Sequence, residues 1–501
     1  MPTQIVVECL DVLLPALTKM INLSLESGCF PESWKHADVH PRLKKPKSEA
    51  TFPNLRPISN LTFVSKLVER VVFNQTHNHL TLNCLYPKAQ SSYREFHSTE
   101  TALLRIKNDI LMKMNTQHLT LLVLLDLSAA FDTVDHVILL NRLNSNFCIS
   151  GRVLSWFRSY LHNRSQSVSV NGETSRSFDV KHGVPQGSCL GPLLFILYVS
   201  KLFTIVERHL PEVHAYADDT QLYIAFKPEP EHATNAVAAM QACITDIRKW
   251  MLMDKLMLND EKTEFIVIGT RQQLVKVDID SLCVGHTAIL PSSEVRNLGG
   301  WFDNQLKMVT QINQTCKAAF FHIFNIRRIR KFLSFDTVQT LVNAFVISRL
   351  DYCNSILFGL PNTELQKLQR VQNTAARLIC NMNKFDHITP ILVKLHWLPV
   401  RYRINFKILL ITFKVIHGLA PKYLSELLTC KTKCNYNLRS TSEILLQQPR
   451  IKTLRTLGDR SFTVAAPALW NNLPNVIRSA TSINSFKKLL KTHLFKIAFN
   501  Q

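Results

Sequence analysis

The sequence lacks features that would place it in a membrane or a secreted fold. No apolar run approaches the roughly 18 residues needed to span a bilayer. Glu8 and Asp11 interrupt the apolar N-terminal stretch, which also lacks the basic region and cleavage site of a signal peptide. The 12 cysteines show no paired spacing, and Cys430 and Cys434 have no second pair to complete a zinc site. We expect a soluble intracellular protein with reduced thiols.

Internal repeats and long low-complexity segments are also lacking, so a solenoid or a disordered chain is not indicated. Hydrophobic residues make up 46% of the 501 residues and charged residues 19%, which is typical of a globular protein. This length accommodates about three domains, each with its own core.

Acidic residues are scarce in the C-terminal two fifths of the chain. Residues 301–501 hold 29 of the 59 Lys and Arg residues but 8 of the 37 Asp and Glu residues, so nearly all of the net charge of +22 lies there. Such a field attracts polyanions, and nucleic acid is the usual one. A solvated basic surface and an acidic lipid membrane are the alternatives that charge alone leaves open.

Hydrophobic periodicity predicts the main elements. Helices are expected in residues 1–35, 62–80, 99–114 and 232–250, and a basic loop over residues 41–47. Leu119–Leu125 is apolar on both faces, as in a central buried strand, and residues 213–216, 221–226 and 264–268 are further strands. After residue 305 the pattern is helical and basic. Its clearest helix has a capping box over Thr363–Gln366 and an apolar stripe formed by Leu365, Leu368, Val371, Ala375 and Leu378.

Three carboxylates stand where a folded core would not tolerate them unpaired. Asp126 closes the buried strand, and Asp218 and Asp219 form the turn between two strands. If the strand ends are neighbours, the acids converge on one point and suit Mg²⁺, a hard cation with oxygen ligands. Two such ions can activate a primer 3′-hydroxyl and stabilise a leaving pyrophosphate. An ordinary acidic β-turn is the alternative for Asp218 and Asp219.

The order of motifs along nearly the whole chain is far more specific than this turn. It resembles the fingers, palm and thumb of non-LTR (LINE-type) retrotransposon reverse transcriptases, particularly the jockey-like elements. The matching segments are Asn54–Ser59, Gln90–Arg94, His97–Ala102, Leu125–Asp132, Gly183–Ser188, Tyr216–Asp219, Leu258–Asn259 with Lys262–Glu264, Arg296–Gly299, Ser348–Tyr352 and Leu395–Pro399.

The resemblance implies an RNA-directed DNA polymerase with an α+β, multi-domain, right-hand fold: an antiparallel palm sheet, helix-rich fingers and a helical basic thumb. The domains implied are an N-terminal helical extension (1–35), fingers (36–117), palm (118–304, with part of the fingers inserted at about 137–180), thumb (305–425) and a basic C-terminal region (426–501). The partners implied are an RNA template, a DNA primer and deoxynucleoside triphosphates (dNTPs).

The same resemblance assigns a role to each site residue. Asp126, Asp218 and Asp219 would bind two Mg²⁺ ions, with Mn²⁺ as an alternative. Lys262 would protonate or attract the leaving pyrophosphate, and a plain surface lysine is its alternative.

Five further residues would contact the incoming nucleotide, namely Arg56, Phe131, Gln186, Gly187 and Tyr216. Arg56 would reach the triphosphate, and Pro57 after it favours extended backbone. The ring of Phe131 would clash with a ribose 2′-hydroxyl, and Gly187 would permit close backbone approach. A core phenylalanine and an ordinary turn glutamine are the alternatives for Phe131 and Gln186.

Residues Asn297, Leu298 and Gly299 resemble the primer-grip hairpin, and the basic helices after residue 305 would hold a template–primer duplex through its phosphates. The chain begins near the family's pre-fingers region, so we expect polymerisation without the family's endonuclease, and the resemblance implies a nuclear location. Two alternatives remain. An RNA-dependent RNA polymerase is disfavoured by Phe131, and a nucleic-acid-binding relic without catalysis would keep the basic thumb.

Overall fold

In the computed structural model the protein is described over residues 3–45, 48–128, 131–209, 212–431, 444–450 and 457–500. The chain divides into two compact units. Unit 1 comprises residues 1–93, 125–220 and 242–262, and unit 2 comprises residues 94–124, 221–241 and 263–501. Within the described residues no helix combines the length and apolar character that crossing a membrane requires.

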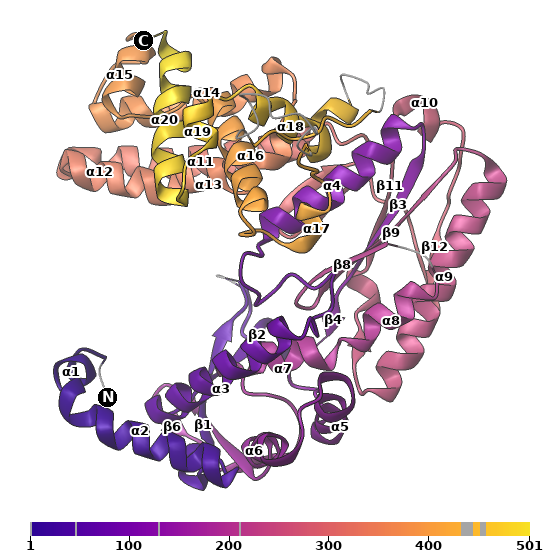
Figure 1. The fold of residues 1–501 in the computed structure, drawn as a ribbon, viewed down its shortest axis with the longest axis vertical. Helices are drawn as coiled ribbons and strands as arrows, with labels where there is room; N and C mark the ends of the chain where they lie inside the picture. The colour runs from indigo at the N-terminus through magenta and orange to yellow at the C-terminus, as the bar shows by residue number, and fades with distance from the viewer. Residues whose placement is uncertain are drawn as a thin grey trace, which may run out of the picture. The chain divides into compact units, whose positions relative to one another are not determined.

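Unit 1 mixes short strands with amphipathic helices (Figure 1). Its elements are α1 (Thr3–Glu8), α2 (Leu10–Ser27), η1 (Glu32–Trp34), β1 (His36–Leu43), η2 (Phe52–Asn54), β2 (Leu55–Asn60), α3 (Phe63–Leu82), β4 (Leu127–Ser128), α5 (His136–Phe147), α6 (Gly151–Leu161), β5 (Arg164–Val170), β6 (Glu173–Thr174), β7 (Phe178–Val180), α7 (Gly191–Tyr198), α8 (Lys201–Glu207), β8 (Glu212–Tyr216), β10 (Met257–Leu258) and η3 (Asp260–Lys262).

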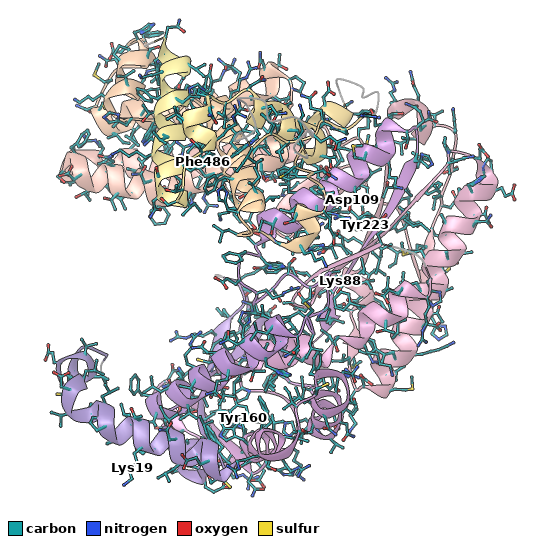
Figure 2. All side chains as sticks on the ribbon, viewed as in Figure 1. Lys19, Lys88, Asp109, Tyr160, Tyr223 and Phe486 are labelled. Atoms are coloured by element: carbon teal, nitrogen blue, oxygen red, sulfur yellow. The ribbon has the colours of Figure 1, made fainter. Side chains whose placement is uncertain are left out.

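Aromatic rings fill part of the core of unit 1. Phe30 packs edge-on against Trp34, Trp156 and Tyr160, with ring centroids 5.1–5.8 Å apart. Tyr160 is labelled in Figure 2, where it lies among the helices of this unit. Edge-to-face packing of this kind stabilises a core beyond the apolar area that it buries. It ties the loop before β1 to α6, and so supports the sheet that carries Arg56.

The first helix of unit 2 is α4 (Thr99–Asn115), and the named elements after β15 in its described part are all helices (Figure 1). Its other elements are β11 (Glu264–Ile268), α10 (Arg271–Leu274), β12 (Leu282–Val284), β13 (Thr287–Ile289), β14 (Glu294–Asn297), β15 (Gly300–Asp303), α11 (Val309–Ile329), η4 (Arg330–Phe332), α12 (Phe335–Val342), η5 (Asn343–Ile347), α13 (Ser348–Asp351), η6 (Asn354–Leu357), α14 (Asn362–Cys380), α15 (Ile388–Lys394), α16 (Val400–Ile416), α17 (Lys422–Ser425), η7 (Gly458–Arg460), α18 (Phe462–Asn471), α19 (Asn475–Arg478) and α20 (Ile483–Phe499).

A four-stranded sheet carries the predicted site motifs, in the order β11-β3-β9-β8. Its two central strands are β3 (Leu119–Leu125) and β9 (Asp219–Phe226). Along the chain, α9 (Pro230–Met253) lies between β9 and β10. β11 pairs antiparallel with β3, from Glu264 opposite Leu124 to Ile268 opposite Thr120. Side chains from Leu119 to Val123 are fully or almost fully buried, as the continuous apolar run predicted for a central strand. The predicted α+β class and antiparallel sheet are confirmed.

Within unit 2, side chains of β9 contact α4. Tyr223 on β9 donates its hydroxyl to Asp109 on α4 at 2.9 Å, and Arg105 pairs with the same carboxylate at 2.7 Å. Figure 2 labels Asp109 and Tyr223 side by side. One continuous apolar core extends from α4 through β14 and β15 to α11, α14 and α15. The Asp109 carboxylate is largely removed from water, and its Arg105 and Tyr223 partners offset the cost of that desolvation.

Two local predictions were wrong. Residues 41–43 belong to β1, where the sequence predicted a loop, and Pro41 stands opposite Pro57 of β2. β1 pairs with β5 only over His36–Val39, so Pro41 lies where β1 has lost one neighbour and a missing N–H is tolerated. Pro46 and Lys47 of the predicted loop lie outside the described residues.

The predicted capping box at Thr363 is also absent. Pro361 is the N-cap of α14 and no side chain caps it, because the helix already starts at Asn362 and Thr363 has helical backbone. The predicted apolar stripe is confirmed: Leu365, Leu368, Val371, Ala375 and Leu378 are all buried. In contrast, Ser98 and Thr101 form a reciprocal capping box at the start of α4.

Candidate active site

The turn between β8 and β9 presents two adjacent carboxylates. Tyr216 ends β8, Ala217 and Asp218 make the turn, and Asp219 begins β9. Ala217 has a left-handed backbone with φ of +60°, which is costly for a residue with a Cβ atom. The strained residue therefore lies directly before the two acids.

A short two-stranded sheet in unit 1 follows Asp126 and fixes its position. The chain leaves β3 at Asp126 and forms β4, which pairs antiparallel with β10. The backbone carbonyl of Asp126 accepts from Asn259 N–H at 2.9 Å, and Lys262 follows in η3. The Lys262 ammonium lies 3.0 Å from Asp126 Oδ2. Residues 136 positions apart in the sequence thus meet as an ion pair.

The three carboxylates interact electrostatically with one another. Burial raises the pKa of Asp218, and the nearby Asp126 raises it further, while Arg56 and Lys262 lower it. Burial also raises the pKa of Asp219 to about 6, with added contributions from Asp218 and Asp126. Like charges at short range disfavour ionisation, so the neighbouring carboxylates raise the pKa values and the two cations oppose this effect at Asp218.

This donor set fits a hard divalent cation. Mutual repulsion among three carboxylates is what a bound divalent ion relieves, and carboxylate oxygens are its preferred ligands. Among the described residues, however, no group of three or more His, Cys, Asp or Glu side chains is arranged so that it could hold a metal ion. In this structure Asp126 pairs with Lys262 instead. Asp126, Asp218 and Asp219 therefore lie within electrostatic range of one another, and Asp126 is engaged by a cation of the chain itself.

Arg56 projects from β2, in the strand geometry that the following proline favours. Its partner across the sheet is Arg42 of β1, and its side chain is exposed. Its positive charge lowers the pKa of Asp218, so the guanidinium lies within electrostatic range of that carboxylate. An exposed guanidinium can bind an anionic group by donating two parallel hydrogen bonds to it.

Gln186 and Gly187 lie against the strand that carries Arg56. Ser59 N–H of β2 donates to Gln186 O at 2.7 Å. Gly187 has φ of +124°, and a Cβ atom there would lie 2.6 Å from Ser59 O, so only glycine fits. The Gln186 side-chain amide donates to both oxygens of Asp132 at 3.1 and 3.2 Å. The loop is therefore attached at its backbone and at its side chain.

Phe131 is anchored from two sides. Its ring packs on Phe195 of α7 with centroids 5.0 Å apart, and its carbonyl accepts from Val184 N–H at 2.9 Å. A cavity of about 210 Å³ next to this loop is lined by side chains that include Pro57, Asp132 and Gln186. The preceding Ala129 and Ala130 of the same motif lie outside the described residues.

Three further residues lie at or near the turn and the Gln186 loop, and the sequence motifs alone gave them no role. Gln90 is buried and hydrogen-bonds to Ala217. Burial raises the pKa of Tyr93, and the nearby Asp218 and Tyr216 raise it further. Asp132 holds Gln186, and burial raises its pKa while Gln186 and Lys44 lower it. All three belong to family-like segments, so the motifs located them, but only the structure connects them to the site.

The predicted hairpin over Asn297–Gly299 is present in unit 2. β14 and β15 pair antiparallel, and Leu298 and Gly299 both have positive φ, as a tight two-residue hairpin turn requires. The Tyr352 hydroxyl donates to Leu298 O at 2.7 Å. A Cβ atom on Gly299 would lie 3.1 Å from that hydroxyl, so the ring supports the turn closely.

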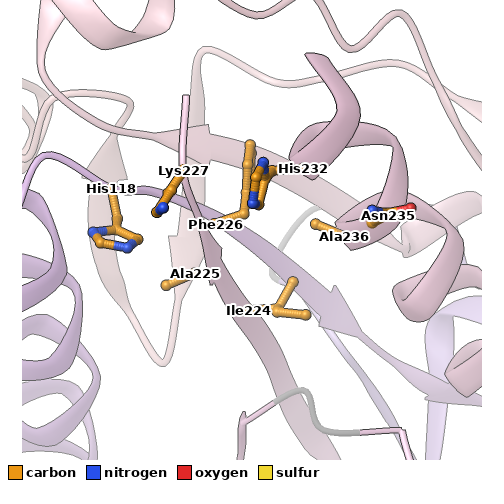
Figure 3. A pocket seen from close by; sticks show the side chains of 8 residues that line it. All are labelled: His118, Ile224, Ala225, Phe226, Lys227, His232, Asn235 and Ala236. Atoms are coloured by element: carbon orange, nitrogen blue, oxygen red, sulfur yellow. The ribbon is translucent and has the colours of Figure 1, made fainter. Parts of the chain in front are cut away.

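A second cavity lies at the other end of β9 (Figure 3). It has a volume of about 340 Å³, and its polar side chains are those of His118, Lys227, His232 and Asn235. The lining contains no carboxylate, which is the principal protein ligand of a magnesium site. The metal chemistry predicted from the sequence was assigned to the turn at Asp218 and Asp219 and not to this cavity.

The crowding of carboxylates has a consequence for stability. The Asp219 carboxyl has a pKa of about 6 in the folded chain against an ordinary 3.8, so the folded state binds its proton more tightly than the unfolded state does. Folding loses this advantage as the pH rises through about 6. We expect Asp219→Asn to raise the melting temperature in EDTA at pH 7.5, with a gain that vanishes near pH 4.

Thermal unfolding across this pH range checks the expectation. Asp246→Asn is the control with opposite sign, because a hydrogen bond from His209 lowers the pKa of Asp246. Its removal should leave stability at neutral pH unchanged or slightly reduced. A lower melting temperature for Asp219→Asn at pH 7.5 would contradict the repulsion argument.

Comparisons with known proteins identify the family of the chain. The family described as reverse transcriptase (RNA-dependent DNA polymerase) matches residues 43–302. The chain is 29% identical over 266 residues to the RNA-directed DNA polymerase from mobile element jockey of Drosophila melanogaster, covering 52% of this chain and 28% of that protein. It is 24% identical over 380 residues to the probable RNA-directed DNA polymerase from transposon X-element of the same organism, covering 74% of this chain and 40% of that protein.

These curated relatives are much longer, since the chain spans less than half of their length. Among solved structures, apo telomerase from Candida tropicalis aligns with a TM-score of 0.42 and 12% identity, over 82% of this chain and 72% of that one. Telomerase from Candida albicans in complex with a fragment of telomeric RNA aligns with a TM-score of 0.37 and 14% identity, over 75% and 63%.

Proposed function

Because this chain belongs to the reverse transcriptase (RNA-dependent DNA polymerase) family, we propose that it extends a primer 3′-hydroxyl with dNTPs along an RNA template. The observation that carries the proposal is the electrostatic coupling of Asp126, Asp218 and Asp219 beside Arg56 and Lys262. An acidic turn with only a structural role does not require two cations and a third carboxylate from a distant part of the sequence.

Each of these charged residues has its own role in the proposed reaction. Asp126, Asp218 and Asp219 would hold Mg²⁺, which when bound supplies the charge that activates the 3′-hydroxyl and stabilises the pyrophosphate. Arg56 binds the triphosphate and neutralises its charge, acting as a fixed guanidinium fork. Lys262 leaves Asp126 for the leaving pyrophosphate, where its ammonium lowers the charge that develops on the bridging oxygen.

The remaining contacts select and orient the nucleotide. Phe131, held by Phe195, presents a ring to the sugar and excludes a 2′-hydroxyl. Gln186, Gly187 and Tyr216 would contact the nucleotide, and Asp132 keeps the Gln186 side chain in place. Positioning of this kind contributes to the rate because it removes the entropy cost of aligning the reacting groups.

Primer extension on an RNA template tests the proposal directly. The purified chain is incubated with a primed RNA, Mg²⁺ and either dNTPs or ribonucleoside triphosphates, and template–primer binding is measured in parallel by fluorescence anisotropy. We expect extension with dNTPs. Binding without any extension would contradict the proposal and identify a nucleic-acid-binding relic, and preferred use of ribonucleotides would indicate an RNA polymerase.

The template–primer would be held in part by one face of α11. This face is formed by Lys317, Phe321, Phe324 and Arg328, which follow one another at helical spacing. Phe321 is 62% exposed and Phe324 61% exposed. Exposed rings between cations fit a nucleic acid, because the cations contact phosphates while the rings pack on sugars or bases.

The double variant Lys317→Gln/Arg328→Gln tests this face. Each lost phosphate contact should reduce the slope of log affinity against log salt concentration by about 1, so the slope should fall by about 2. Arg271→Gln/Lys276→Gln removes the same charge from α10 and the turn that follows it, and we expect it to leave the slope unchanged. Equal effects of the two double variants would show that only net charge matters.

A further inference from the structure

A short segment before α4 runs beside the strand that leads to the catalytic turn. Lys88, labelled in Figure 2, precedes it. Ala215 N–H of β8 donates to Ala89 O at 2.9 Å, and Ser91 N–H donates to Ala215 O at 2.8 Å. The Ser91 hydroxyl lies 2.8 Å from His214 Nε2. The segment thus adds a parallel bridge to β8, centred on Gln90 and Ala215.

The side chain of Gln90 reaches from this segment into the turn. It is fully buried. Its Oε1 accepts from Ala217 N–H at 3.0 Å, and its amide donates to Ala217 O at 3.3 Å. Oε1 also accepts from Ser92 N–H at 3.1 Å. Because two backbone N–H groups point at one atom, that atom must be the oxygen, and the orientation of the amide is determined.

These two bonds fix both peptide groups that flank Ala217. With φ of +60°, Ala217 has a backbone conformation that alanine disfavours, and it persists only where its surroundings impose it. The peptide that Ala217 O belongs to also carries the N–H of Asp218. An amide that holds this peptide plane therefore sets the direction in which the Asp218 carboxylate leaves the chain.

We propose that Gln90 is a positioning residue that holds the Ala217 backbone and thereby aims Asp218 and Asp219 at the divalent metal. This inference rests on the proposed function for its catalytic consequence, but metal binding tests it independently. Gln90 contacts neither the metal nor the nucleotide in this scheme. Its effect is on the geometry of the carboxylates, so it should alter kcat and metal affinity more than nucleotide binding.

The test compares Gln90→Met with a matched control. Gln372 is also a fully buried glutamine whose amide donates to a backbone carbonyl, Leu398 O at 2.8 Å, but it lies in unit 2. Gln372→Met therefore removes an equivalent buried amide elsewhere. The measurements are melting temperature, Mn²⁺ binding by electron paramagnetic resonance, template–primer affinity, and kcat, dNTP KM and the Mg²⁺ dependence of primer extension.

For Gln90→Met we expect at least fivefold weaker Mn²⁺ binding, and a kcat about a hundredfold lower, which is the loss associated with misplacing reacting groups by about 1 Å. The dNTP KM and template–primer affinity should change less than threefold. Gln372→Met should lower the melting temperature similarly while leaving Mn²⁺ binding and kcat within twofold. If Gln90→Met does not fold, Gln90→Asn is used, because its amide is too short to reach Ala217.

Each outcome decides the matter. Unchanged Mn²⁺ binding and kcat in the Gln90 variant, effects equal to those of Gln372→Met, or no Mn²⁺ binding by the parent chain would overturn the positioning role. A parent chain that binds Mn²⁺ but extends no primer would refute the proposed function alone. The positioning role would then stand or fall on the Mn²⁺ affinity of the Gln90 variant.

Discussion

Asp218→Asn is expected to reduce primer extension by at least about a thousandfold. A metal bound at this carboxylate supplies several kcal/mol of transition-state stabilisation, and about 4 kcal/mol corresponds to that factor. The substitution keeps the shape of the side chain but removes its negative charge. The measurement is single-nucleotide extension under saturating template–primer, where the loss should appear in kcat.

The binding of template–primer separates this effect from unfolding. Asp218→Asn removes charge repulsion from a site beside other carboxylates, so affinity for nucleic acid should be unchanged or higher. Asp278→Asn, an exposed aspartate in a loop of unit 2, is the matched control and should extend primers normally. Activity of Asp218→Asn within tenfold of the parent would refute the assignment of the metal site to this turn.

Phe131→Ala is expected to lower the preference for dNTPs over ribonucleotides by about a hundredfold. The ring excludes a 2′-hydroxyl by occupying its space, and an apolar surface that rejects one hydroxyl discriminates by about that factor. The packing of Phe131 on Phe195 keeps the ring from rotating away. The quantity measured is the ratio of kcat/KM for a dNTP to that for its ribonucleotide.

A loss of the fold would reduce both rates together and leave this ratio unchanged. Phe157→Ala provides the comparison, because Phe157 is a fully buried ring that packs on Trp156 in α6. We expect it to lower stability and to leave the ratio unaltered. A ratio unaffected by Phe131→Ala would mean that another group senses the sugar, and that Phe131 is a core residue.

The amino-acid sequence was sufficient for features that depend on neighbouring residues. The buried character of β3, the turn before Asp219 and the helices α3, α4 and α9 follow from periodicities of two or 3.6 residues and from local turn chemistry. Such patterns have local causes, so they can be read without knowing what packs on them. The ordered motifs of the resemblance also located the segments that form the site.

The tertiary structure decided which residues meet. Gln90 reaches Ala217 across 127 positions, and Lys262 pairs with Asp126 across 136. Neither contact has a local signature, because each depends on strands brought together by the packing of the whole sheet. The same reason explains the errors at Pro41 and Thr363. Whether a strand can continue through a proline depended on where β1 loses one of its neighbours. Where the helix starts depended on Pro361 and not on Thr363 alone.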